Sequence, residues 1–198
     1  VEYDKDGSLL LLPGSRIQPI QRILPILLDA TETIIQSFPE LKIEIPVPNA
    51  QVMKCVEQIL SKRTQLKDRV LIPEDFGKLK ARAALMSSGT MSFACALAGV
   101  PGLIAYKAHP LTYWLGRMLI KVPFLGMANL LLPDDPPYRE FIQTEANGEN
   151  LYRAVREILE NKSSGEVFWK ASLKLKEILE EPQKSDAVDW LATELGMP

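Results

Sequence analysis

The stretch AALMSSGTMSFACALAGVPGLIAY, residues 83–106, contains no charged residue. Two polar or Pro-Gly turns, at residues 87–90 and 100–102, interrupt it, so we interpret it as three elements rather than as a membrane span. Residues 84–86 end a buried strand, the Ser-Gly-Thr turn opens a helix, and residues 101–106 form the next buried strand. This order of elements predicts a parallel α/β sheet.

The turn Ser88-Gly89-Thr90 is a candidate binding site. Free backbone N–H groups, two hydroxyls and the positive end of a helix dipole meet at such a turn. These groups favour an anion such as phosphate, and Gly89 lets a ligand approach the backbone closely. The alternative interpretation is an ordinary Ser or Thr N-cap of the helix.

A second small turn, Gly14-Ser15-Arg16, lies between a leucine-rich strand at residues 8–12 and a long helix at residues 17–38. In doubly wound sheets, ligands bind at the carboxyl ends of the strands. Both turns follow strands, so the sequence predicts a phosphate site where they converge.

The remaining chain continues the alternation of strands and helices. We expect strands at residues 41–47 and 69–72, and a strand or extended segment at 124–132. Helical patterns are expected at residues 51–60, 76–82, 111–122, 138–143, 150–161, 166–181 and 185–195. Pro25 is expected to bend helix 17–38 or to start it afresh. The prediction is a doubly wound, Rossmann-like α/β domain over residues 1–162 and a helical extension over 163–198.

Composition limits the classes of function. The chain has 198 residues, 46% hydrophobic and 24% charged, with a net charge of −2. This is a soluble globular composition without the basic excess typical of a nucleic-acid partner. Cys55 and Cys95 lie in apolar helical contexts and are expected to be reduced core residues. No secretory signal heads the chain, and it begins without Met, which suggests part of a longer protein.

No metal site is expected. The single histidine, His109, excludes a site with two histidines, and we assign it no catalytic role. Asp134 and Asp135 could suggest a divalent cation, but adjacent carboxylates on a Pro-rich loop are more often helix caps.

Several motifs together resemble the lipid-A-disaccharide synthase family. They are LLPGSR at residues 11–16, SGT at 88–90, AYKAHPLTYWLGRMLIKVPF at 105–124, AN at 128–129 and EFIQ at 140–143. The family consists of GT-B glycosyltransferases with two Rossmann-like domains. The resemblance covers residues 9–159 and corresponds to the C-terminal half, which binds the nucleotide sugar.

The resemblance implies a specific reaction. The family transfers diacylglucosamine from its UDP form to diacylglucosamine 1-phosphate in lipid A biosynthesis, without metal or cofactor. The implied partners are the UDP-sugar donor, the lipid-linked glucosamine acceptor and an N-terminal glycosyltransferase half. The implied location is cytoplasmic and peripheral to the inner membrane. Helix 111–122, with Trp114, could contact lipid headgroups, although packing of its apolar face in the core is the alternative.

The resemblance also implies donor-binding residues. They are Gly14, Ser15, Arg16, Ser88, Gly89, Thr90, Tyr106, Lys107, Asn129, Glu140 and Gln143. Arg16 suits this role because a guanidinium can pair with diphosphate oxygens through two donors. The catalytic residues are not identified.

The sequence departs from the family pattern at several positions. The family usually has Glu where Pro19 and Ala94 stand, and an arginine–glutamate pair where Asp134 and Asp135 stand. A weakened or non-catalytic module for binding or assembly is therefore an alternative function. Another UDP-sugar enzyme of the same fold, such as an epimerase, is a third, but the acid and base side chains that it needs cannot be placed.

Overall fold

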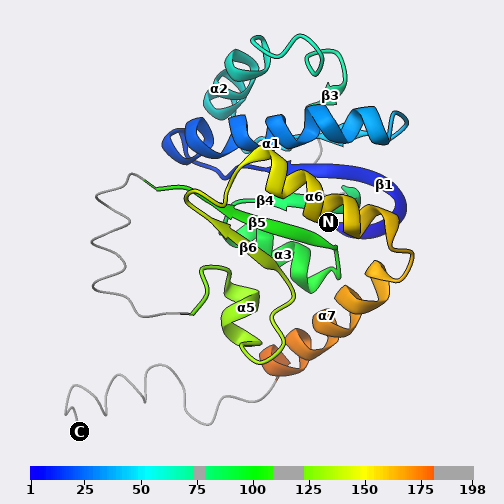
Figure 1. Cartoon of the computed structure of the whole chain (residues 1–198). Helices are drawn as coiled ribbons and strands as arrows, with labels where there is room; N and C mark the ends of the chain where they lie inside the picture. The colour runs from blue at the N-terminus through cyan, green and yellow to red at the C-terminus, as the bar shows by residue number, and fades with distance from the viewer. Residues whose placement is uncertain (74–78, 109–122, 181–198) are drawn as a thin grey trace, which may run out of the picture.

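The computed structural model describes residues 1–73, 79–108 and 123–180. Within these residues, six parallel strands form one sheet in the order β3-β2-β1-β4-β5-β6 (Figure 1). The strands are β1 (Glu2–Leu12), β2 (Ile43–Glu44), β3 (Val70–Leu71), β4 (Lys80–Met86), β5 (Gly102–Tyr106) and β6 (Arg139–Ile142). The helices are α1 (Ile17–Ser37), α2 (Ala50–Leu60), α3 (Thr90–Leu97), α5 (Met127–Leu131), α6 (Gly148–Glu160) and α7 (Ser164–Glu180).

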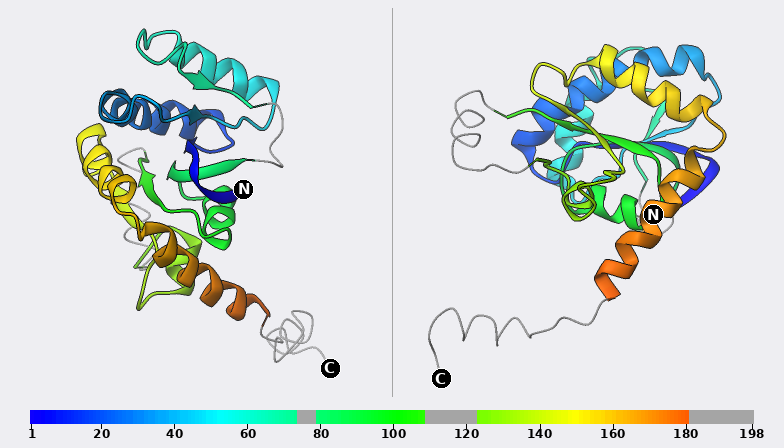
Figure 2. Two further views of the ribbon diagram at one scale, coloured as in Figure 1. Left: turned by 90° about the vertical axis from the view of Figure 1, so that its right-hand side faces the viewer. Right: turned by 60° about the horizontal axis from the view of Figure 1, so that its bottom comes forward.

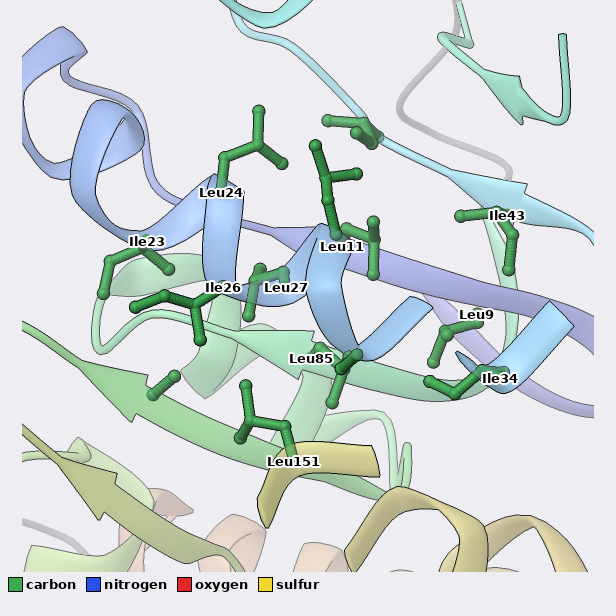
Figure 3. Close-up of a cluster of buried hydrophobic side chains, with 14 of the residues drawn as sticks. Leu9, Leu11, Ile23, Leu24, Ile26, Leu27, Ile34, Ile43, Leu85 and Leu151 are labelled. Carbon is green, nitrogen blue, oxygen red and sulfur yellow. The ribbon is translucent and has the colours of Figure 1, made fainter. Parts of the chain in front are cut away.

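Helices cover both faces of the sheet, because side chains of a strand point alternately to opposite faces. Leu9 and Leu11 of β1 pack in one cluster with residues of α1, α2 and α6 (Figure 3). Leu10 and Leu12 pack in a second cluster with residues of α3, α5 and α7. The two sets of helices lie on opposite sides of the sheet in Figures 1 and 2. The predicted doubly wound α/β fold is confirmed.

The sheet order changes direction between β1 and β4. From β1 the chain proceeds outward through β2 and β3, then returns to pair β4 with the other side of β1. The loops that leave β1 and β4 therefore run to opposite faces of the sheet, toward α1 and α3. Such a switch point leaves a crevice at the carboxyl ends of the two strands.

The predicted helix at residues 76–82 is wrong over its described part, because Lys80 to Arg82 begin β4. Residues 74–78 lie outside the described residues. β1 begins at Glu2, well before the predicted strand, and pairs Glu2 with Lys80 and Tyr3 with Ala81. Long-range pairing of these two strands overrides the local helical pattern.

Near the β6 edge of the sheet, one predicted extended segment is a helix and one predicted helix is a strand. The expected extended segment at 124–132 contains α5, and the expected helix at 138–143 is β6, paired with β5. Tyr138 and Phe141 are both buried and three residues apart, which imitates helical spacing. The pairing with β5 decides the structure of β6.

Helix α1 runs without a break through Pro25, so the expectation that Pro25 would start the helix afresh is wrong. Cys55 and Cys95 are free and buried, as predicted. The predicted helices at residues 111–122 and 185–195 lie outside the described residues, as does His109.

Helix α7 packs against the domain near α3. The Ser172 hydroxyl donates a hydrogen bond of 2.6 Å to the Leu97 carbonyl, and Leu175 is fully buried. The Phe168 ring lies 5.5 Å from that of Tyr138. The beginning of the expected C-terminal extension therefore contributes to the core on the α3 side of the sheet.

Candidate functional site

A cavity of about 700 Å³ lies at the switch point of the sheet. The turn after β1, the turn after β4 and the end of β5 contribute to its lining. Eight of the eleven residues predicted to bind the donor line it: Gly14, Ser15, Arg16, Ser88, Gly89, Thr90, Tyr106 and Lys107. The predicted convergence of the two small turns is therefore observed.

The turn after β1 requires glycine at its centre. Gly14 has a φ of +115°, and a Cβ there would lie 3.2 Å from the Ser87 hydroxyl oxygen. Arg16 follows as the N-cap of α1 in an extended conformation, and its side chain makes no capping hydrogen bond. Its guanidinium is exposed at the cavity, where it can pair with an anion.

The turn after β4 has an unusual cap. Gly89, rather than a serine or threonine, is the N-cap of α3, so the alternative of an ordinary Ser or Thr cap is not found. The Ser92 hydroxyl accepts a hydrogen bond from the Gly89 amide and donates one to the Gly89 carbonyl. A Cβ built on Gly89 would meet no atom within 4 Å. The surface at Gly89 is therefore open for a ligand.

Gln143 supports the end of β5 rather than lining the cavity. Its side-chain oxygen accepts a hydrogen bond of 2.9 Å from the Ala108 amide, and its nitrogen donates one of 3.4 Å to the Ala108 carbonyl. Ala108 itself lines the cavity, next to Lys107. Gln143 therefore holds a lining residue, Ala108, and does not line the cavity itself.

Asn129 and Glu140 also do not line the cavity. The Asn129 side chain is fully buried and bonds to the Tyr138 backbone and to Glu140. The Glu140 carboxylate accepts hydrogen bonds from the amides of Leu125 and Gly126. These residues hold the segment before α5.

Sequence reasoning missed several lining residues, among them Arg22, Pro46, Pro48 and Met91. Pro19 and Arg22 are three positions apart on α1, and residues at this spacing are neighbours on a helix surface, so the two could have been recognised as one patch of the helix. The charged residues among the described lining are Arg16, Arg22 and Lys107, all cations. The cavity therefore favours a ligand with more than one negative charge.

The two positions at which the resemblance leads us to expect Glu differ in location. Pro19 lines the cavity, whereas Ala94 lies on α3 and outside the lining. The departure at Pro19 therefore changes the cavity itself.

Burial raises the pKa values of two groups, Cys95 on α3 and Tyr138 just before β6. It raises the pKa of the Cys95 thiol from 9.0 to about 12, and it raises the pKa of Tyr138 well above 10.0. The Tyr138 hydroxyl donates a hydrogen bond of 2.9 Å to the Val100 carbonyl. A protonated, buried thiol is a poor nucleophile, so Cys95 is a structural residue.

Asp135 pairs with Lys174 at 2.8 Å. Within residues 1–73, 79–108 and 123–180, no group of three or more His, Cys, Asp or Glu side chains is placed to hold a metal ion. Across the same residues, no helix has the length and apolar character needed to span a membrane.

The fold and the cavity define a doubly wound α/β domain with a crevice at its switch point whose charged lining residues, within the described chain, are cations. The family model for lipid-A-disaccharide synthetase matches residues 1–192, and the chain belongs to this family. The predicted family resemblance is confirmed.

Individual relatives agree. The chain is 34% identical over 157 residues to the lipid-A-disaccharide synthase of Nitrosococcus oceani, covering 78% of this chain and 40% of that protein. It is 33% identical over 155 residues to that of Blochmanniella pennsylvanica, covering 77% and 39%. The chain thus matches about 40% of the length of these relatives.

A solved structure from Listeria monocytogenes, assigned as a UDP-N-acetylglucosamine 2-epimerase, has the same fold. It superimposes with a TM-score of 0.52 at 16% identity, covering 91% of this chain and 48% of that one. This likeness concerns the fold alone.

Proposed function

We propose that the chain is the donor-binding part of a lipid-A-disaccharide synthase and that it binds the UDP moiety of a UDP-sugar in the cavity. One observation carries the proposal: two small turns, one of them with an open backbone at Gly89, converge at the switch point, beside three cations. A nucleoside diphosphate has the charge that such a set of groups recognises.

The proposed roles follow from the geometry. Arg16 pairs with diphosphate oxygens, and the backbone at Gly89 and Thr90 approaches them from the other turn. Lys107 and Arg22 add positive charge around the same volume. When the donor is cleaved, negative charge grows on the leaving UDP, and these groups stabilise it. No residue of the described chain is assigned as the base that activates the acceptor.

The reaction and its other participants are part of the proposal. The family's name and the relatives' names support synthesis of the lipid A disaccharide. The proposed reaction is the one that the resemblance implies, transfer of diacylglucosamine from UDP to diacylglucosamine 1-phosphate. The acceptor-binding site and the base are proposed to lie in a second glycosyltransferase half, as the partial coverage of the relatives suggests. Contact with the cytoplasmic face of the inner membrane would bring the lipid-linked substrates to the enzyme.

Calorimetry with UDP tests the proposal, with inorganic diphosphate as the comparison ligand. We expect UDP to bind at one site and more tightly than inorganic diphosphate, since the cavity has apolar lining beside the cations. A polypeptide of these 198 residues is expected to bind UDP without forming disaccharide, because transfer also needs a positioned acceptor and base. No binding of UDP by a folded chain would contradict the proposal.

A weakened or non-catalytic module remains the second candidate, and Pro19 at the cavity favours it. Activity of the longer protein distinguishes the two candidates. UDP binding without disaccharide formation, in a protein that also contains the second half, would support the binding module.

A further inference from the structure

The Glu140 carboxylate forms the centre of a hydrogen-bond network beside the cavity. It accepts hydrogen bonds from the Leu125 amide at 2.8 Å, the Gly126 amide at 2.9 Å and the Asn129 side-chain nitrogen at 2.8 Å. Three donors therefore converge on one side chain. We call Asn129 and Glu140 the clamp.

Asn129 fixes the clamp to the protein core. Its side-chain oxygen accepts a hydrogen bond of 3.0 Å from the Tyr138 amide, and its nitrogen donates one of 2.7 Å to the Tyr138 carbonyl. Tyr138 is almost fully buried, and its hydroxyl is bonded to Val100. The clamp therefore has little freedom to move.

The clamp is connected to the turn at Ser88–Thr90 through one residue, Leu125. Leu125 donates its amide to Glu140, and its carbonyl accepts a hydrogen bond of 2.6 Å from the Ser88 hydroxyl. Ser88 lines the cavity and precedes Gly89, the N-cap of α3. The position of Leu125 therefore sets where the Ser88 hydroxyl finds its acceptor.

Packing at Gly126 shows how closely this segment is held. A Cβ at Gly126 would overlap Ile104 and lie 3.2 Å from the Glu140 carboxylate. The backbone of the segment thus lies against both β5 and the clamp. A side chain at this position would displace one or the other.

We propose that Glu140 and Asn129 are positioning residues for the donor site, acting on the turn at Ser88 through Leu125. They touch no ligand themselves, because their polar atoms are used within the clamp. This inference rests on the proposed function for its effect on affinity.

A double-mutant cycle tests the connection, with UDP affinity as the readout. Glu140→Gln is expected to weaken UDP binding by about tenfold, the typical effect of one hydrogen bond to a charged group. Ser88→Ala is expected to weaken it by about twofold to tenfold, because the lost hydrogen bond to the Leu125 carbonyl joins two neutral groups. The double variant is expected to bind UDP about as tightly as the single variant with the larger loss of affinity, since both changes break the same chain of contacts. The matched control is Glu160→Gln on α6, which is exposed and pairs with Arg156. It should leave affinity unchanged.

Multiplied losses in the double variant, with wild-type protein binding UDP normally, would overturn the positioning role and leave the proposed function standing. A ligand-free measurement separates the opposite case. In Glu140→Gln, the amide resonances of Ser88 and Gly89 are expected to shift, whereas Glu160→Gln should not move them. These shifts, in a protein that fails to bind UDP, would support the clamp and contradict the proposed function.

The ligand-free measurement has a second variant in case Glu140→Gln does not fold. Ser88→Ala should shift the Leu125 and Gly126 amides, while Thr90→Ala on the same turn should leave them in place. Unchanged Leu125 and Gly126 resonances in Ser88→Ala would overturn the inference.

Discussion

The backbone amide of Ser87 donates a hydrogen bond of 2.8 Å to the carbonyl of Leu12. This bond joins the last residue of β1 to the first residue after β4, so the two turns that follow these strands begin side by side. Arg16 and Gly89 therefore lie at the same cavity although they are far apart in the sequence. The predictions below depend on this arrangement.

Arg16→Ala is expected to weaken UDP binding while the fold is retained. Loss of a hydrogen bond to a charged partner costs roughly 1.5–3 kcal/mol, about tenfold to hundredfold in affinity. Arg16 makes no capping bond in the free protein, so its loss should leave the melting temperature close to that of the wild type. Calorimetry and thermal unfolding measure the two quantities.

The matched control is Arg153→Ala. Arg153 is exposed on α6 and pairs with Glu149 within its own helix. Equal UDP affinities for Arg16→Ala, Arg153→Ala and the wild type would show that Arg16 is only a surface residue.

Gly89→Ala is expected to impair binding without destabilising the protein. The added methyl group meets no atom within 4 Å, and the backbone of Gly89 is extended, which alanine adopts readily. The methyl group would occupy space that the diphosphate needs against the backbone. Gly14→Ala offers the contrast, because at a φ of +115° strain of about 1–3 kcal/mol is expected to lower stability.

Denaturant unfolding and UDP titration of both glycine variants measure these effects. A Gly89→Ala protein that binds UDP as tightly as the wild type would mean that the ligand does not approach this turn.

The free energy of unfolding is expected to fall as the pH rises above 9, because the buried Cys95 thiol stays protonated in the folded protein. Burial raises the pKa of its thiol from 9.0 to about 12, so above pH 9 the unfolded chain loses this proton while the folded chain keeps it. The contribution of this group is complete below pH 9. It falls by up to about 1.4 kcal/mol per pH unit as the pH rises toward 12.

Denaturant unfolding between pH 9 and 10 tests this expectation. Cys95→Ala should show a shallower fall in the free energy of unfolding than the wild type. Tyr138→Phe should change the slope less than Cys95→Ala in this range, because the ordinary pKa of 10.0 for tyrosine lies at its upper limit. Identical slopes for Cys95→Ala and the wild type would rule out the buried thiol as the cause.

The fold class and the two turns at the cavity could be predicted from the sequence for a local reason. The turns at Gly14–Arg16 and Ser88–Thr90 lie directly after apolar strands, and parallel strands end at a common edge of the sheet. Arg22 was missed because its contribution depends on the exact direction of α1. Pro46 and Pro48 were missed because they reach the cavity only through the pairing of β2 with β1.

Asn129 and Glu140 show a different limit. The family resemblance predicts them as donor contacts, but a motif does not reveal the hydrogen bonds that hold these side chains within the protein. Here their hydrogen bonds go to Tyr138, Leu125 and Gly126. The same region gave the wrong types for α5 and β6, because burial of Tyr138 and pairing with β5 are long-range effects.

Amide chemical-shift mapping of a UDP titration tests the central claim most directly. The two-turn site predicts that resonances of residues 14–16 and 88–90 move first and saturate with a single dissociation constant. Shifts confined to α6 and α7, with these two turns unmoved, would contradict it.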